Sequence, residues 1–152
     1  MKIGKNISYN SAIKSDTAIR LGIDNTPSAS AVEAMQLLCE KVIDPLYEVF
    51  PSMTFNSFYR SPKLNTAIGG SATSQHVRGE AIDLDSKDNA FNKAIFDYIV
   101  KNLDFDQVIN EYPDKEGNPS WVHVSYKKTG NRKQILKAVK VNGKTTYVPY
   151  KS

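Results

Sequence analysis

Apolar residues recur at three- and four-residue steps from position 30 to about position 50, which is the period of an amphipathic helix. Pro45 lies inside this run, and we expect it to kink the helix or divide it in two, because proline lacks the N–H group that a helix interior requires. A second apolar stripe follows later, and Asp88 or Asn89 is the predicted cap of that helix. Residues 10–21 predict a short helix near the start of the chain.

Shorter segments in which apolar and polar positions alternate predict strands. Residues 53–60 alternate in this way and contain several aromatic side chains. Residues 61–74 predict a loop with one helical turn at its start, and residues 79–85 predict a strand that leaves a glycine turn. Two further β-rich segments, residues 105–112 and 121–126, flank a run of turn residues and therefore predict a hairpin.

The end of the chain places Asn142 and Gly143 between two more β-rich arms. This dipeptide tolerates the positive φ angles of a tight turn, so it predicts a second hairpin. Helices thus precede strands that pair as hairpins, which is the order of an α+β fold. We expect a single domain over residues 1–152, with N-terminal helices packed on a mainly antiparallel sheet.

The composition is that of a globular chain, since 40% of the residues are hydrophobic and 24% are charged. No apolar run approaches the roughly 20 residues of a membrane span. The N-terminal segment lacks the apolar core of a secretory signal, so we expect a cytoplasmic protein unless another protein releases it. Cys39 is the only cysteine, which excludes an intramolecular disulfide and a cysteine-rich metal site.

The net charge of +4 and the pI near 9.1 favour anionic partners, such as nucleic acid, anionic lipid or the polyanionic cell wall. The basic residues are dispersed, with mild clustering between residues 127 and 137. No segment interleaves arginine with aromatic residues as a nucleic-acid platform does. We interpret these charges as a solvated face and expect neither nucleic acid nor a membrane as partner.

The chain has only two histidines, and His76 stands seven residues before Asp83. On one helix these two residues would be about 10.5 Å apart along the axis, too far for a shared metal ion. Gly79 allows the chain to turn between them, which could bring Asp83 back towards His76. A carboxylate between Ile82 and Leu84 in a core strand is costly to bury without a partner, and a metal cation would supply one.

The second histidine, His123, shares a strand face with Trp121 and Ser125. Each histidine alone would be interpreted as a partly buried, hydrogen-bonded residue. Two imidazoles and one carboxylate together suit zinc, and they leave the fourth position open for water as in catalytic sites.

The spacing of five residues resembles the S-x-H-x-x-G-x-A-x-D signature of the zinc D-alanyl-D-alanine carboxypeptidase family: Ser74, His76, Gly79, Ala81 and Asp83. That family includes phage endolysins that cleave L-alanyl-D-glutamate bonds, and it shares its core fold with the hedgehog signalling domain. Residues 121–126 resemble the segment with the last zinc ligand, and residues 59–70 resemble the segment upstream of the signature. Residues 20–27 resemble the start of the cell-wall-peptidase branch often found in phages.

The resemblance implies roles for particular residues. His76, Asp83 and His123 would hold one zinc ion. Arg60 would bind a substrate carboxylate or the developing oxyanion, for which its planar fork of donors is suited. Ser74 would either donate a hydrogen bond to substrate or shape the turn, and these two alternatives stay open.

The catalytic base is less directly specified. Many members of the family have an acidic residue three positions before the last histidine, where this chain has Ser120. Residues 105–111 instead resemble the strand that ends in the catalytic glutamate of hedgehog-like members, which points to Glu111 with a lengthened loop after it. Asp114 and Glu116 lie in that loop and remain alternatives.

We therefore expect a monomeric zinc peptidase that hydrolyses a bond in peptidoglycan stem peptides or crosslinks, as an endolysin or a carboxypeptidase. A phage or prophage lysin that crosses the membrane through a holin pore fits the small basic chain. The rival interpretations are a zinc-bound, non-catalytic module that binds cell wall or protein, and a nucleic-acid-binding protein. The sequence leaves open which bond is cut, whether cleavage is internal or terminal, and which bacterium is the target.

Overall fold

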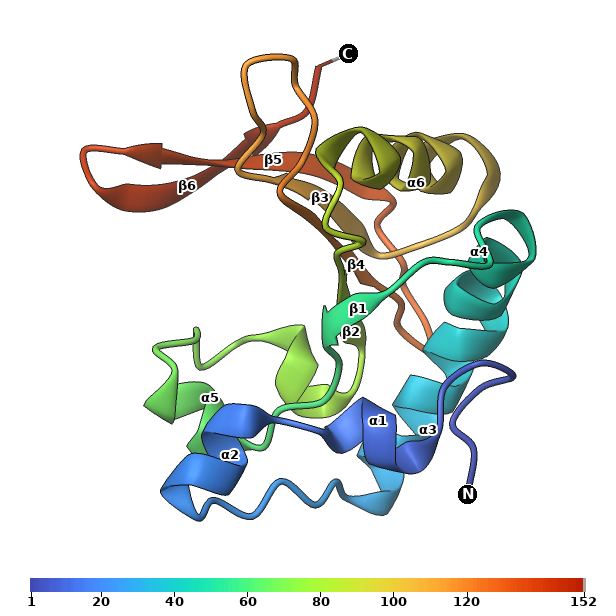
Figure 1. Cartoon of the computed structure of the whole chain (residues 1–152), viewed down its shortest axis with the longest axis vertical. Helices are drawn as coiled ribbons and strands as arrows, with labels where there is room; N and C mark the ends of the chain where they lie inside the picture. Colours follow the sequence, from blue (N-terminus) through green and yellow to red (C-terminus); the bar gives the residue numbers. More distant parts are fainter. Residues whose placement is uncertain (152) are drawn as a thin grey trace.

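The structure, a computed structural model, describes residues 1–151 (Figure 1). Six α-helices precede or interrupt a six-stranded sheet, so the predicted α+β class is confirmed. The helices are α1 Tyr9–Ile13, α2 Asp16–Leu21, α3 Ala29–Leu38, α4 Asp44–Val49, α5 Pro62–Ala67 and α6 Asn89–Asn102. The strands are β1 Phe55–Ser57, β2 Ala81–Leu84, β3 Gln107–Glu111, β4 Trp121–Ser125, β5 Gln134–Val141 and β6 Lys144–Pro149.

The sheet has the strand order β1-β2-β4-β3-β5-β6. Both predicted hairpins are present: β3 pairs with β4, and β5 pairs with β6 around a turn in which Asn142 and Gly143 have φ of 52° and 78°. All neighbouring strands are antiparallel except β3 and β5, which run parallel. The sheet is therefore mainly antiparallel, as predicted, with one parallel junction that local sequence patterns did not indicate.

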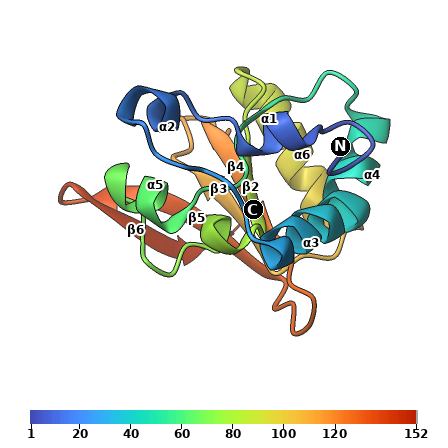
Figure 2. The ribbon, with the colours of Figure 1, turned by 90° about the horizontal axis from the view of Figure 1, so that it is seen from below.

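The two faces of the sheet differ in character. Alternate residues of the central strands, such as Leu84, Val108 and Val122, are fully buried in the main hydrophobic core with residues of α3, α4 and α6. These helices lie together on one side of the sheet, whereas α5 lies on the other side (Figure 2). Because side chains alternate along a strand, the intervening residues point to the second face, where Ile109, Leu136 and Ala138 form a small separate apolar cluster.

The helix predicted around Pro45 is divided as expected, but through a π-helical turn rather than a break. Residues Cys39–Ile43 form this turn, and the N–H of Asp44 donates to the carbonyl of Cys39, five residues back. Pro45 then lies in the first turn of α4, a position at which helices tolerate a residue without an N–H.

Two predicted elements were longer than those in the structure. The single helix predicted for residues 10–21 is two helices, because Ser15 turns to an extended conformation and caps α2 by accepting from the N–H of Ala18. Within residues 53–60, only Phe55–Ser57 forms a strand, since the pairing of β1 with β2 is irregular there. Of the two candidate caps, Asp88 caps α6 by accepting from the N–H of Phe91.

Within residues 1–151, no helix combines the length and the hydrophobicity needed to cross a membrane.

Candidate metal centre and active-site cleft

The turn that carries His76 is a short 3₁₀ helix, Gln75–Arg78. The Ser74 hydroxyl caps it by accepting from the N–H of His76, and Gly79 ends it with φ of 74°. A Cβ atom at Gly79 would lie only 2.4 Å from the carbonyl oxygen of Ala31 in α3. The predicted glycine turn is therefore confirmed, and both its backbone conformation and its packing against α3 require glycine.

The turn and strands β2 and β4 bring His76, Asp83 and His123 together. Asp83 lies directly opposite His123 in the antiparallel register of β2 and β4. Asp83 Oδ1 is 3.2 Å from His76 Nε2 and 3.1 Å from His123 Nδ1. The three potential ligand atoms all lie within 4.8 Å of one another.

The donor set fits a zinc ion. The Phe58 carbonyl oxygen lies 2.7 Å from His76 Nδ1, so Nδ1 carries the proton and Nε2 presents its lone pair to the cluster. Nε2 is buried and has no hydrogen-bond partner within the described residues. Tetrahedral zinc with bonds near 2.0–2.2 Å separates its ligand atoms by about 3.3 Å, close to both of the distances from Asp83.

Asp83 is held as an anion. Burial alone would raise the pKa of this carboxyl, but the neighbouring imidazoles of His76 and His123 outweigh burial and hold the pKa well below its usual range. An ionised carboxylate beside two imidazole nitrogens is the protonation state that cation binding requires.

Glu111 ends β3 and lines the same cleft as the three candidate ligands. Its carbonyl accepts from the N–H of Ser120, the position where many family members were expected to carry their acidic residue. The hairpin thus places Glu111 beside position 120 in space. Only 6% of Glu111 is exposed, and burial raises its pKa to about 7, with the charge of His123 opposing and that of Asp83 adding to this effect.

The two alternative bases lie elsewhere. Asp114 is in the loop after Glu111, where its carboxylate accepts from the N–H groups of Glu116 and Asn118 and from the side chain of Asn89. Within residues 1–151, neither Asp114 nor Glu116 lines the cleft. The geometry therefore favours Glu111 of the three carboxylates.

Arg60 and Ser74 also line the cleft. The backbone N–H of Arg60 donates to the carbonyl of His76, and its side-chain Nε is buried without a partner in the described chain. Burial lowers the pKa of the Arg60 guanidinium, while the charge of Asp83 opposes this shift. The three candidate ligands, Glu111, Arg60 and Ser74 thus all line one cleft of about 870 Å³.

The cleft has further walls that the sequence did not indicate. Tyr112 and Trp121 pack against each other at one end, with ring centroids 5.3 Å apart and ring planes tilted by 55°, and Tyr147 of β6 also lines the cleft. The other end is polar and is lined by Gln75, Gln107, Arg132 and Gln134. Arg132, Gln134 and Tyr147 reach the cleft because β5 pairs in parallel with β3, which sets Gln134 beside Gln107 and Ala138 beside Glu111.

No curated protein matches the chain significantly. The model of the family described as Peptidase M15 matches residues 5–125, from before α1 to the end of β4. This span contains all three candidate ligands, Glu111, Arg60 and Ser74, and it agrees with the zinc carboxypeptidase and endolysin resemblance of the signature. The chain therefore belongs to the peptidase M15 family, whose members are zinc enzymes.

Proposed function

We propose that the chain hydrolyses a peptide bond in peptidoglycan stem peptides or crosslinks, using one zinc ion held by His76, Asp83 and His123. The observation that carries the proposal is the shared cleft, in which a buried carboxylate, Glu111, faces the same space as the three candidate ligands. Membership of a peptidase family supports hydrolysis as the reaction. The cell-wall substrate rests on the resemblance of the signature, and the net charge of +4 suits a polyanionic wall.

Zinc at this site would polarise the peptide carbonyl and lower the pKa of a bound water to about 7. Glu111 accepts a proton from the attacking water and returns it to the departing amine. A pKa of about 7 suits both roles, because the group then takes up and releases a proton near neutral pH. Its burial keeps bulk water away from the transferred proton.

Arg60, in the same cleft, binds a substrate carboxylate or the developing oxyanion. Its buried Nε lacks a partner within residues 1–151, so an oxygen of the substrate would satisfy it. The hydroxyl of Ser74 already accepts from the N–H of His76, which supports its role in shaping the turn and leaves its O–H free to donate to the substrate.

We further propose that the protein acts as a monomer on the cell wall, and that it is a phage or prophage lysin released through a holin pore. This part of the proposal rests on the resemblance of residues 20–27 to the cell-wall-peptidase branch often found in phages.

Mass spectrometry of purified muropeptides after digestion tests the function and identifies the bond, because each possible cleavage gives a different product mass. We expect zinc-loaded protein to release peptide fragments, excess chelator to abolish release, and added zinc to restore it. The His76→Ala variant should be inactive in the same assay. Full activity in excess chelator, or in this variant, would contradict the proposal.

Glu111→Gln separates the peptidase from a binding module of the same fold. If this variant still binds zinc and keeps every function of the protein, hydrolysis is not the function and the non-catalytic alternative replaces it.

A further inference from the structure

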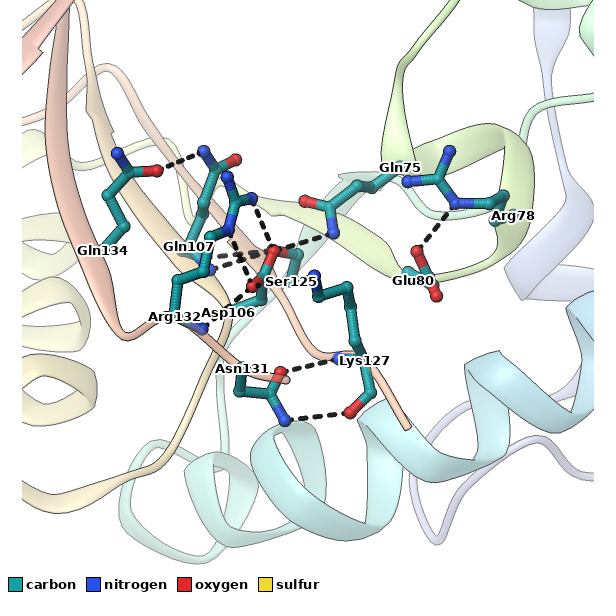
Figure 3. Close-up of polar contacts among 10 residues, drawn as sticks. All are labelled: Gln75, Arg78, Glu80, Asp106, Gln107, Ser125, Lys127, Asn131, Arg132 and Gln134. Atoms are coloured by element: carbon teal, nitrogen blue, oxygen red, sulfur yellow. Dashed lines mark hydrogen bonds and ion pairs between the residues drawn. The ribbon is translucent and has the colours of Figure 1, made fainter. Parts of the chain in front are cut away.

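A second buried carboxylate, Asp106, organises the polar end of the cleft (Figure 3). It lies directly before β3 and is 0% exposed. Its two oxygens accept from the backbone N–H, Nε and Nη2 of Arg132 at 2.8–3.0 Å, and Lys127 Nζ lies 3.6 Å away. This bidentate pairing fixes the plane of the Arg132 guanidinium, which lines the cleft with N–H groups still available.

Gln75 is the third partner of Asp106. Its Nε2 donates to Asp106 Oδ2 at 3.0 Å, which fixes the orientation of the amide because the carboxylate, whose pKa is lowered to about 2, has no proton to donate. Oε1 is therefore the other amide atom, and it is buried with no hydrogen-bond partner among the residues described. In Figure 3 this oxygen lies on the side of Gln107 and Arg132, and only the amide nitrogen is joined to Asp106.

A buried acceptor without a donor is rare in folded proteins and costs free energy, so its presence in a cleft points to a ligand that supplies an N–H group. Gln75 is only 8% exposed, yet it contributes to the cleft lining. Beside it, the side chains of Gln107 and Gln134 bond each other across β3 and β5 and line the same end.

The charge at this end is positive. Arg132 and Lys127 each contribute one positive charge, and Asp106 contributes one negative charge. A ligand that offers both a carboxylate, for Arg132, and an N–H group, for Gln75, would satisfy the groups that remain unpaired.

The register of the sheet places the Gln107 flank of this end relative to the metal centre. Ile109 pairs with His123, and Gln107 lies two residues before Ile109 on β3. Two strand residues span about 7 Å, which is also the length of about two residues of an extended peptide.

We propose that Gln75 and Arg132, oriented by Asp106 and flanked by Gln107 and Gln134, form a substrate subsite for a free carboxylate and its neighbouring peptide N–H, about two residues from the scissile bond. The inference rests on the proposed function, because it treats the occupant of the cleft as a peptide. A glutamate linked through its side chain, as in peptidoglycan stems, has this chemistry: its α-carbon carries both a free carboxylate and the peptide nitrogen. The subsite therefore distinguishes stems with this carboxylate from stems in which it is amidated.

The test compares two peptides on the zinc-loaded Glu111→Gln protein, in which turnover is blocked and affinity is measured by calorimetry. One peptide is L-Ala-γ-D-Glu-L-Lys-D-Ala, and the other carries an amide in place of the glutamate α-carboxylate. We expect the carboxylate peptide to bind at least about tenfold more tightly than the amide peptide, because the amide peptide lacks the charge-assisted hydrogen bond to Arg132. This comparison leaves the protein unchanged, so it does not depend on a variant folding.

The Arg132→Lys variant, made in the same Glu111→Gln protein, keeps a positive charge beside Asp106 but loses the fork of donors, so the preference should fall to threefold or less. Arg78→Lys is the matched control: its side chain is 53% exposed against 51% for Arg132, and it pairs with Glu80 rather than with a group of the cleft. It should keep the full preference.

Equal affinity for the two peptides, or a preference that survives in Arg132→Lys, would overturn the subsite. Failure of the proposed function has a different signature. A protein with Glu111 intact that cleaves no peptide, yet still prefers the carboxylate, would refute the peptidase proposal and retain the subsite.

Discussion

Asp83, a largely buried residue of the cleft lining, and Asp106, a fully buried residue behind that lining, both have a carboxyl pKa below the ordinary value, yet their partners differ. Asp106 accepts from Arg132 and Gln75, groups that carry their own protons and satisfy it fully. Asp83 faces two imidazoles, one of which presents an unprotonated nitrogen without a hydrogen-bond partner in the described chain. A carboxylate satisfied by donors stabilises the fold, whereas a carboxylate beside lone pairs is arranged for a cation.

The largest expected difference between the two carboxylates is in metal binding. Asp83→Ala removes a proposed ligand, so we expect zinc affinity to fall by more than 100-fold and hydrolysis to disappear, because even groups behind metal ligands affect affinity by about 10–100-fold. Asp106→Asn should keep one zinc per chain. Elemental analysis after dialysis against a zinc buffer measures the zinc content of both variants. Equal zinc content would show that the two carboxylates do not differ in metal binding.

Glu111→Gln tests whether the cleft needs a proton acceptor besides the ligands. The rate of peptide hydrolysis should fall by about 10²–10⁴-fold, with zinc content unchanged, because the amide cannot take up the proton of the attacking water. Asp114→Asn, in the neighbouring loop, is the matched control and should change the rate less than twofold. A large loss in the control with little loss at Glu111 would transfer the role of base to Asp114.

In the zinc-free protein, substitution of Asp106 should reduce stability more than substitution of Asp83 does. Asp106→Ala leaves Arg132 and Gln75 without their common acceptor, and we expect the free energy of unfolding to fall by about 3 kcal/mol. In Asp83→Ala, the free energy of unfolding should fall by about 1 kcal/mol or less. Urea unfolding in the presence of chelator measures both variants. If Asp83→Ala lowers the free energy of unfolding in chelator more than Asp106→Ala does, the role of Asp83 is structural and the two carboxylates do not differ as described.

The smallest expected effect is the pH dependence due to Asp106. Because its pKa is lowered to about 2 in the folded state, its contribution is complete above the unfolded value of 3.8 and is lost as the pH falls from about 4 to about 2. We expect this loss to be about 1–2 kcal/mol. Urea unfolding of wild-type and Asp106→Asn protein between pH 5 and pH 2.5 measures it, and parallel pH profiles for the two proteins would contradict the assignment.

The sequence predicted the residues whose roles are visible in local patterns. Gly79 between His76 and Asp83 indicated the turn, and Asn142–Gly143 indicated the last hairpin, because both depend on the conformation of a few neighbouring residues. The position of Glu111 also followed from local pairing, since a hairpin keeps the residues that flank its loop close together.

Features that depend on distant pairing could not be predicted in this way. The parallel junction of β3 and β5 joins segments separated by the whole of β4, and no periodicity in either strand encodes it. Consequently Arg132, Gln134 and Tyr147 gave no signal of facing the cleft. The sequence also gave no indication that Asp106 and Gln75 interact, because each is an ordinary polar residue until the fold brings the two together.

The boundary at residue 125 has a consequence for how such a protein can change. The family match ends there, with the last strand that carries a candidate ligand, while Arg132, Gln134 and Tyr147 follow it. The β5–β6 hairpin lies at the edge of the sheet and contacts the ligand strands only through β3. If the proposed subsite sets the choice of substrate, substitutions in this hairpin would redirect that choice and leave the proposed zinc ligands and Glu111 unchanged, so the two properties could be inherited and engineered separately.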